Sequence, residues 1–512
     1  LEVLAYKGSL QLTHQSLAGL RKEGLSAGVL KRLESAQGEL WESWDEMLTA
    51  VNIPPQADNA EALRELLRKH ALGKPQILRD DEFGKIWFQQ DYRFETPKAQ
   101  MMFRINSAEV YSSPRNAVLS QLYTDAIREG FNEFGYPVRL AGLEYGINVD
   151  KEGINLTFSG YSDRIKELVK TVAGRLKKIS IDQKTFNTLK EVRLRRYQNF
   201  HFQQPYQQAF YYRSLLLEGR KFSIMDYEKE IKKIKLKDLK KFADKLYDSI
   251  YIEGLAYGNL RAETVSEAAE VLRKKLAAKP LAEEKRFINT VRQLNAGDSH
   301  TYTRKMQVEN SAVVTDIQVG QRSPELQAVL MVIDSLMQPQ FYNDLRTSQQ
   351  LGYIVNSGMT GLEKTLGLIF IIQSGEYDTA TLEQRMDAFL GKFNDSLKEL
   401  PDAELNNIKK SVLNSKLQKT TSVTAEAGRL FTLAFEKNAE FDANSREIRA
   451  LEELTREDIL DVVNSYLRPS KQRKLILRMS GKDHAAGNSA GELISSIAKF
   501  KARYACPEKC LP

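Results

Sequence analysis

The chain has 512 residues, of which 42% are hydrophobic and 28% are charged, an ordinary composition for a globular protein. Lys and Arg (75) exceed Asp and Glu (67) by a net charge of +8, which is far below the density of a histone or a ribosomal tail. Two cysteines and five histidines exclude a disulfide scaffold and a cysteine-rich zinc fold, and they leave few ligands for any metal site. The length allows about two to four domains.

The hydrophobic runs are short. The longest, Leu366–Ile372, is interrupted only by Gly367 and falls far below the ~20 apolar residues of a membrane helix. It predicts a buried strand, and we expect no contact with a membrane. The chain starts at Leu1 without an initiator Met or a signal-peptide pattern, so we interpret its start as a cut edge.

Residues 1–75 are predicted to form a helical segment, to which we assign no role. A capping-box pattern over residues 58–61 precedes leucines at helical spacing, and Gly73 is a suitable helix end. An earlier amphipathic helix is indicated by a second set of apolar residues: Leu30, Leu33, Leu40, Trp41 and Trp44.

From about residue 80 the pattern changes to strands mixed with helices. Ser113 and Pro114 supply the N-cap and the first position of a helix. The predicted order is two strands, this helix, a hairpin and two further helices: 85–88, 99–105, 113–131, 143–149 with 154–158, 165–176 and 183–198.

The same order of elements recurs about 210 residues later. Ser323 and Pro324 repeat the helix-opening chemistry of the first copy. The second copy has a strand, this helix, a hairpin and a later helix: 311–319, a helix from 323, 351–355 with 366–372, and a helix opened by 401–404. We therefore predict an α+β fold of two homologous domains, each a mainly antiparallel sheet packed with helices.

A lysine-rich stretch, Lys221–Lys245, lies between the copies. Apolar residues interleave with its lysines, which favours an amphipathic helix with a solvated lysine face. A patch that binds polyanions is the alternative. The stretch lacks the basic and aromatic pattern of single-strand binding proteins, so we expect no nucleic acid as a partner.

No known catalytic motif is complete in this chain. None of the histidines (His14, His70, His201, His300, His484) has the His-Glu-x-x-His or His-x-x-Glu-His spacing of zinc hydrolases. There is also no Gly-x-Ser-x-Gly elbow, P-loop or dinucleotide fingerprint. We therefore expect no metal site in this chain.

Arg346 and Tyr353 are the candidate site residues. They lie seven positions apart, where a long helix ends and a strand begins. A fixed guanidinium beside a phenol is suited to hold a peptide carbonyl and to stabilise developing negative charge. The alternative is a helix-end Arg paired with a carboxylate and a strand Tyr packed in a core.

The surrounding block, residues 341–355, resembles the pitrilysin/insulinase family of zinc metallopeptidases, in the C-terminal half of its four-domain members. Its key residues are Phe341-Tyr342-Asn343, Leu345-Arg346-Thr347 and Gln350-Leu351-Gly352-Tyr353. Collinear segments over residues 76–480 agree with it: 85–91, 97–99, 140–143, 160–161, 204–205 with 211–212, and 258–259.

The resemblance implies a division of labour. In that family the first of four domains carries the zinc, and the third and fourth close over it to enclose a peptide chamber. It implies third and fourth domains here at 76–285 and 286–484, with a tail at 485–512. It also implies that Arg346 and Tyr353 reach the scissile peptide, and that zinc belongs to an absent N-terminal half, which would be the partner of this chain.

Two hypotheses follow. The first is the zinc-less half of an endopeptidase that degrades peptides, inactive by itself. The second is a non-catalytic structural or peptide-binding member of the same fold. Localisation is open; Cys506 and Cys510 would suit an oxidising compartment, and we favour a bacterial periplasm over the cytoplasm.

Overall fold

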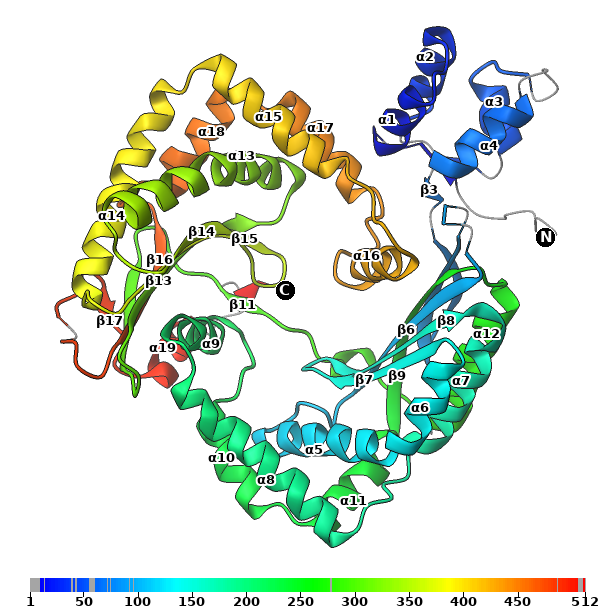
Figure 1. Cartoon of the computed structure of the whole chain (residues 1–512), viewed down its shortest axis with the longest axis horizontal. Helices are drawn as coiled ribbons and strands as arrows, with labels where there is room; N and C mark the ends of the chain where they lie inside the picture. The colour runs from blue at the N-terminus through cyan, green and yellow to red at the C-terminus, as the bar shows by residue number, and fades with distance from the viewer. Residues whose placement is uncertain are drawn as a thin grey trace. The chain divides into compact units, whose positions relative to one another are not determined.

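The computed structural model describes residues 10–511 except 13, 38–39, 42–43, 55–59, 71, 74, 92, 95, 277–278, 486 and 505–509. The chain divides into two compact units, each assembled from three stretches of sequence (Figure 1). The first unit takes Leu1–Arg193, Lys229–Phe287 and Leu417–Ser445. The second takes Leu194–Glu228, Ile288–Lys416 and Arg446–Pro512.

The first unit is built on a seven-stranded sheet of order β4-β5-β9-β6-β8-β7, with β10 also paired to β9. Neighbours are antiparallel except β5 with β9 and β10 with β9. The strands are β4 (Gln76–Asp81), β5 (Gly84–Gln90), β6 (Lys98–Ser107), β7 (Leu143–Val149), β8 (Gly153–Tyr161), β9 (Ser249–Gly258) and β10 (Lys279–Pro280).

The second unit has a six-stranded sheet of order β14-β15-β13-β16-β12-β17. Only β12 pairs in parallel, with β16 and β17. The strands are β12 (Ser299–Lys305), β13 (Ser311–Gln321), β14 (Ile354–Thr360), β15 (Thr365–Ser374), β16 (Arg473–Ser480) and β17 (Glu492–Leu493); a separate ribbon pairs β11 (Val291–Arg292) with β18 (Cys510–Leu511).

The two sheets share one topology, which confirms the α+β fold of two homologous copies. The path β7-β8-β6-β9-β5 has the same order and strand directions as β14-β15-β13-β16-β12. β15 is buried along its whole length, as its apolar run predicts.

The helices repeat in the same order. The predicted N-caps are present, because the Ser113 hydroxyl accepts from Asn116 N (3.1 Å) and the Ser323 hydroxyl accepts from Leu326 N (3.1 Å). The first copy has α5 (Pro114–Gly130), α6 (Asn132–Leu140), α7 (Ser162–Leu176), α8 (Gln183–Asn199), α9 (Pro205–Leu217), α10 (Ile224–Lys233), α11 (Leu236–Leu246) and α12 (Ala262–Leu276). The second has α13 (Pro324–Phe341), α14 (Thr379–Ser396), α15 (Asp402–Lys416), α16 (Val423–Phe435), α17 (Ala443–Glu453), α18 (Arg456–Val462) and α19 (Ile497–Arg503).

A lysine performs the same task in both copies. Lys190 on α8 donates from Nζ to the carbonyls of Lys232 (3.0 Å) and Ile234 (2.8 Å), where α10 ends. Lys409 on α15 donates to the carbonyls of Glu452 (3.1 Å) and Leu454 (2.5 Å), where α17 ends. An ammonium group satisfies carbonyls that a helix end leaves without partners, so these contacts fix the end of each short helix.

Each unit also contains one helix from the other copy's stretch of sequence. Helix α16 packs on β6 and β9 of the first unit, and α9 packs on β13, β15 and β16 of the second (Figure 1). Both contacts bury apolar side chains: Ala427, Leu430 and Phe431 against Trp87, Leu255 and Tyr257, and Ala209, Tyr212 and Leu216 against Val314, Ile371 and Leu477. The two copies therefore exchange a helix.

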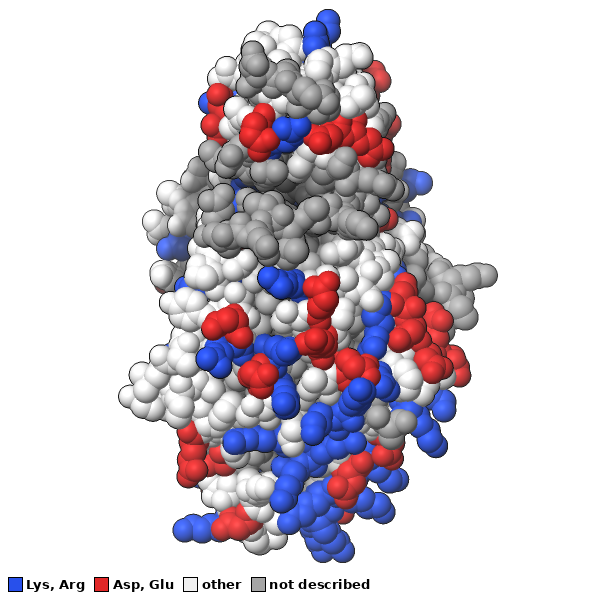
Figure 2. Space-filling view, turned by 90° about the vertical axis from the view of Figure 1, so that its right-hand side faces the viewer, with Lys and Arg blue, Asp and Glu red and all other residues white. Residues whose placement is uncertain are grey.

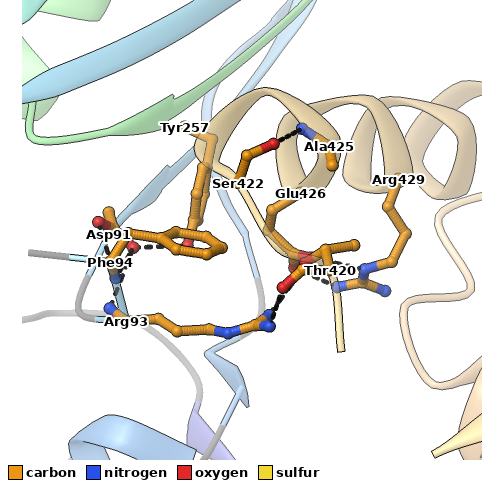
Figure 3. Close-up of polar contacts among 9 residues, drawn as sticks. All are labelled: Asp91, Arg93, Phe94, Tyr257, Thr420, Ser422, Ala425, Glu426 and Arg429. Carbon is orange, nitrogen blue, oxygen red and sulfur yellow. Dashed lines mark hydrogen bonds and ion pairs between the residues drawn. The ribbon is translucent and has the colours of Figure 1, made fainter. Parts of the chain in front are cut away.

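Polar contacts hold the exchanged segment on the first unit (Figure 3). Glu426 is 2% exposed and accepts from Arg429 (Nε 3.0 Å, Nη2 2.5 Å) and from the Thr420 hydroxyl (2.6 Å). Burial raises the pKa of this carboxyl, but the Arg429 and Thr420 hydrogen bonds outweigh burial and lower it overall. Arg93 donates to Thr420, and Asp91 accepts from the Tyr257 hydroxyl (2.7 Å).

The lysine-rich stretch forms two helices, α10 and α11, where the sequence predicted one. Leu239, Phe242 and Leu246 of α11 are buried while its lysines are exposed, as the amphipathic interpretation predicts. Lys and Arg side chains gather on the lower part of the face shown in Figure 2. Nothing in the fold tests the alternative of a polyanion patch.

The N-terminal segment is less regular than predicted. The single helix expected around Leu30–Trp44 is instead α2 (Ala27–Ser35) and α3 (Trp44–Ala50), separated by β2 (Leu40–Trp41). The segment also has α1 (His14–Lys22), α4 (Ala60–His70) and a sheet of order β2-β1-β3 with β1 (Leu10–Gln11) and β3 (Leu72–Gly73). Its leucines form a separate small core. The predicted cap at 58–59 and the Cys506–Cys510 pair lie outside the residues whose side chains are described.

Candidate functional site

The candidate site is built on the end of helix α13. After Phe341 the helix widens into a π-helical turn over Tyr342–Ser348. Leu345 in this turn and Leu351 after it are both buried, and Leu351 N donates to the Leu345 carbonyl (3.0 Å). These two leucines attach the turn to the core, so the polar residues between them are held against a rigid base.

Two backbone features carry the chain from this turn into β14. Gln350 adopts a left-handed conformation (φ 54°), which reverses the chain direction. Gly352 lies so close to β15 that an added Cβ would be 2.0 Å from the Gln373 carbonyl oxygen. The Gln373 side chain in turn donates to Gln204 Oε1 (2.8 Å), just before α9. The exchanged helix therefore supports the wall behind the site.

β14 begins at Ile354, three residues later than the predicted strand over 351–355. The reason is the close approach of Gly352 and the turn at Gln350, which place residues 351–353 before the ladder. Tyr353 consequently lies at the mouth of the strand, where a turn residue can project into solvent.

The structure brings Arg346 and Tyr353 together. Arg346 Nη1 donates to the Tyr353 carbonyl oxygen (2.5 Å), and its guanidinium carbon lies 4.8 Å from the centre of the Tyr353 ring. The same guanidinium carbon lies 5.2 Å from the centre of the Tyr342 ring. Both distances fall within the range of cation–π attraction, so two aromatic rings and one carbonyl fix the guanidinium.

The packing alternative for this pair is wrong. Tyr353 is 82% exposed and is no core residue. Arg346 has no carboxylate within ion-pair distance among the residues that the structure describes. Nearby Asp344 instead accepts from Gln349 Nε2 (3.0 Å). The guanidinium keeps N–H donors free of any carboxylate, beside a solvent-facing phenol, and this arrangement can bind a carbonyl or a developing oxyanion.

Tyr342 is a third member of this site that the sequence reasoning did not single out. It is 43% exposed and lies four residues before Arg346. Residues four apart share one helix face, and this spacing was the signal that would have found it.

The residues present do not fit a metal. Within the described part of the chain, no three His, Cys, Asp or Glu side chains lie together as a metal site would require. His201, His300 and His484 are apart from one another and have separate partners: Glu228 (3.0 Å), Tyr504 (2.6 Å) and Ser311 (2.7 Å). Likewise, no described helix is long and apolar enough to cross a membrane.

Family models match both copies. One, described as the middle or third domain of peptidase M16, matches residues 33–230. Another, described as the PQQ synthase PqqF-like C-terminal lobe domain 4, matches residues 332–431 and includes Arg346 and Tyr353. The first match begins inside the N-terminal segment to which the sequence analysis assigned no role.

Curated relatives agree. Insulin-degrading enzyme from Homo sapiens is 29% identical over 417 residues, which are 80% of this chain and 40% of that protein. Insulin-degrading enzyme-like 1, peroxisomal, from Arabidopsis thaliana is 28% identical over 466 residues, 88% of this chain and 48% of that protein. The chain therefore spans less than half the length of these relatives.

Solved structures share the fold. Pitrilysin superposes with a TM-score of 0.76 at 17% identity, covering 95% of this chain and 62% of pitrilysin. A structure titled peptidase M16 inactive domain, from Pseudomonas fluorescens, gives 0.60 at 17% identity and covers 82% of this chain and 99% of that one.

Fold and relatives together define a peptidase-type α+β protein. The chain belongs to the pitrilysin/insulinase family of peptidases and corresponds to its C-terminal half.

Proposed function

We propose that this chain is the zinc-less half of a zinc endopeptidase, which binds peptide substrates and stabilises the transition state of their cleavage. The observation that carries the proposal is the Arg346–Tyr353 pair. Its guanidinium is held by a carbonyl and two rings, and its phenol faces solvent. A donor fixed before the reaction stabilises developing charge without reorganising, which is a large term in peptide hydrolysis.

The residues have distinct roles in this proposal. Arg346 donates to the carbonyl oxygen of the peptide bond under attack, and the Tyr353 hydroxyl supplies a second hydrogen bond. Tyr342 holds the guanidinium in place. Zinc, with the water that it activates, is assigned to an N-terminal half, either in the same polypeptide or in a separate chain; that half and this one would enclose the substrate.

The test is cleavage of a peptide by this chain together with its zinc-bearing half. Removal of one oxyanion donor costs about 10²–10³-fold in kcat, so Arg346→Ala is expected to show a loss of this order with a modest change in KM. Tyr353→Phe is expected to lose about tenfold, since one hydrogen bond is worth about 1–1.5 kcal/mol. Arg385→Ala, at an exposed position on α14, is the control.

Two results would overturn the proposal. One is wild-type kcat in both site variants. The other is peptidase activity with stoichiometric bound zinc in the 512-residue chain alone, because the proposal places both in the other half.

A non-catalytic, peptide-binding or structural member of the fold is the second candidate. The structural neighbour titled as an inactive domain favours it, since this chain covers 99% of that protein. Peptide binding without any gain in cleavage on addition of zinc-bearing halves would support this candidate.

A periplasmic location is a further part of the proposal. Fractionation of the source cells tests it, and recovery of the chain in the cytoplasm would contradict it.

A further inference from the structure

A second concave site lies in the first unit, beside strand β7. It is a cavity of about 470 Å³, a size that suits a small ligand or a few side chains of a peptide. Its walls come from the end of α5, from α6 and from β7. In the duplicated fold this is the place that the Arg346–Tyr353 site occupies in the second unit, where α13 ends and β14 begins.

The cavity opens onto the outer edge of the sheet. β7 is the last strand and pairs only with β8. Five consecutive residues of β7, 144–148, line the cavity. Side chains alternate between the two faces of a strand, so five in succession can border one cavity only if it lies along the strand's edge. An unpaired edge of this kind is a template for an added strand.

Two arginines stand on the walls of the cavity. Arg128 is fixed, because its Nε donates to the Ile147 carbonyl (2.8 Å) and its Nη2 to Asn148 Oδ1. Arg139 projects from α6 and is exposed. Within the described residues neither guanidinium lies within ion-pair distance of a carboxylate. Glu144 also lines the cavity, so two cations share it with one anion.

The remaining wall is apolar and aromatic. The Tyr145 ring packs against Phe131 (5.3 Å between centroids) and Phe134 (5.7 Å). On α6, Tyr136 and Leu140 are 62% and 72% exposed and lie four residues apart, hence on one face of the helix. Large apolar side chains exposed together commonly mark an interaction surface.

We propose that this cavity is a second peptide-binding site, distinct from Arg346 and Tyr353, which adds an extended segment to the edge of β7 and pairs a carboxylate of that segment with Arg128 and Arg139. The strand edge supplies main-chain hydrogen bonds, and the arginines select acidic sequences. Tyr136 and Leu140 contact the apolar residues that flank the carboxylate. The carboxylate comes from an Asp or Glu side chain or from a peptide C-terminus.

Fluorescence anisotropy of short labelled peptides with the 512-residue chain tests this without any cleavage assay. One peptide carries an internal Asp and an amidated C-terminus. A second carries Asn in its place and a free C-terminus, and a third carries Asn with an amidated C-terminus. A fourth repeats the better binder with alternate backbone nitrogens methylated, which prevents addition to a strand. Binding of the first or the second identifies the source of the carboxylate.

Variants of opposite sign locate the binding. Arg139→Gln should weaken the acidic peptide about three- to tenfold, since a partly exposed ion pair contributes about 1 kcal/mol. Glu144→Gln should strengthen it, because it removes the competing anion. Arg164→Gln, an exposed site on α7 with the same charge change, should leave it unaltered.

The proposal is overturned if no peptide binds, if the neutral or the methylated peptide binds as well as the acidic one, or if Arg139→Gln and Glu144→Gln both match wild type. Arg346→Gln serves as a further control. Loss of binding in that variant alone would assign the peptide to the site of the second unit and overturn the proposal as well.

Discussion

The two units use one scaffold and end its first helix in two ways. In the second unit, α13 continues into a π-helical turn, and Tyr353 is left 82% exposed beside Arg346. In the first unit, α5 is followed by the short helix α6, and Tyr145 packs between Phe131 and Phe134. The tyrosines that the sequence aligned, Tyr145 and Tyr353, therefore differ in environment although their sheets are equivalent.

The difference teaches that the helix end, and not the sheet, decides what each unit presents. Burial raises the pKa of Tyr145, and its hydroxyl donates to the Phe131 carbonyl (3.3 Å), so this phenol serves packing. One additional turn of wider helix in the second unit directs the corresponding region outward. Duplicated folds can thus keep the core and change the chemistry with a few residues between a helix and a strand.

The largest effect is expected where each unit holds its exchanged helix. Arg213 on α9 pairs with Asp316 on β13, and these side chains are 7% and 1% exposed. Asp316→Asn leaves a buried guanidinium without its counter-charge, which costs about 3–5 kcal/mol. Urea unfolding measures it. Asp395→Asn removes an exposed pair with Lys398 and should cost under about 1 kcal/mol.

Glu426→Gln performs the same test in the first unit and is expected to cost a similar amount, because Arg429 and Arg93 lose the carboxylate between them. A loss no larger than that of Asp395→Asn in either unit would contradict a role for these buried charges in fixing the exchange.

A smaller effect should separate the two strand entries. Gly352→Ala places a Cβ against the Gln373 backbone carbonyl, which cannot move without displacing β15, so about 1–3 kcal/mol is expected. Gly146→Ala on β7 meets only the Thr157 hydroxyl (2.5 Å), which can rotate, and should cost less than about 1 kcal/mol. Thermal unfolding of both variants measures the difference, and equal losses would contradict the backbone contact.

The lysines that close α10 and α17 should behave alike. Lys190→Met and Lys409→Met each remove two hydrogen bonds to helix-end carbonyls, and burial lowers the pKa of both ammonium groups. A loss of about 1–2 kcal/mol is expected for each variant. Urea denaturation tests it, with Lys170→Met on the exposed face of α7 as the control. Stability lost in one copy only would show that the repeated contact is not equivalent.

Most of the fold and part of the site could be predicted from the sequence. Period-two runs and the Ser-Pro caps at 113 and 323 located strands and helices, because these signals are local. The helix exchange could not be predicted, since it depends on which sheet face lies within reach of α9 and α16. The late start of β14 was missed for a similar reason: the close approach of Gly352 to Gln373 involves a strand twenty residues away in sequence. The proximity of Arg346 to Tyr353 was predicted, whereas the aromatic contact from Tyr342 required the π-helical turn.

The smallest effect concerns pH and the second unit alone. His300 is 2% exposed, and its Nε2 bonds to the Tyr504 hydroxyl (2.6 Å), which donates to Asp298 (2.6 Å). Burial outweighs the attraction of Glu492 and Asp298 and lowers the pKa of His300, with Arg503 adding to the effect. The unfolded chain therefore takes up this proton first as the pH falls. Stability should be complete above the unfolded pKa of about 6.5 and decline below it. In unfolding measured from pH 7.5 to pH 5, His300→Gln should show a shallower decline than wild type, because the variant has no imidazole to protonate. A slope unchanged by this substitution would assign the acid sensitivity to other groups.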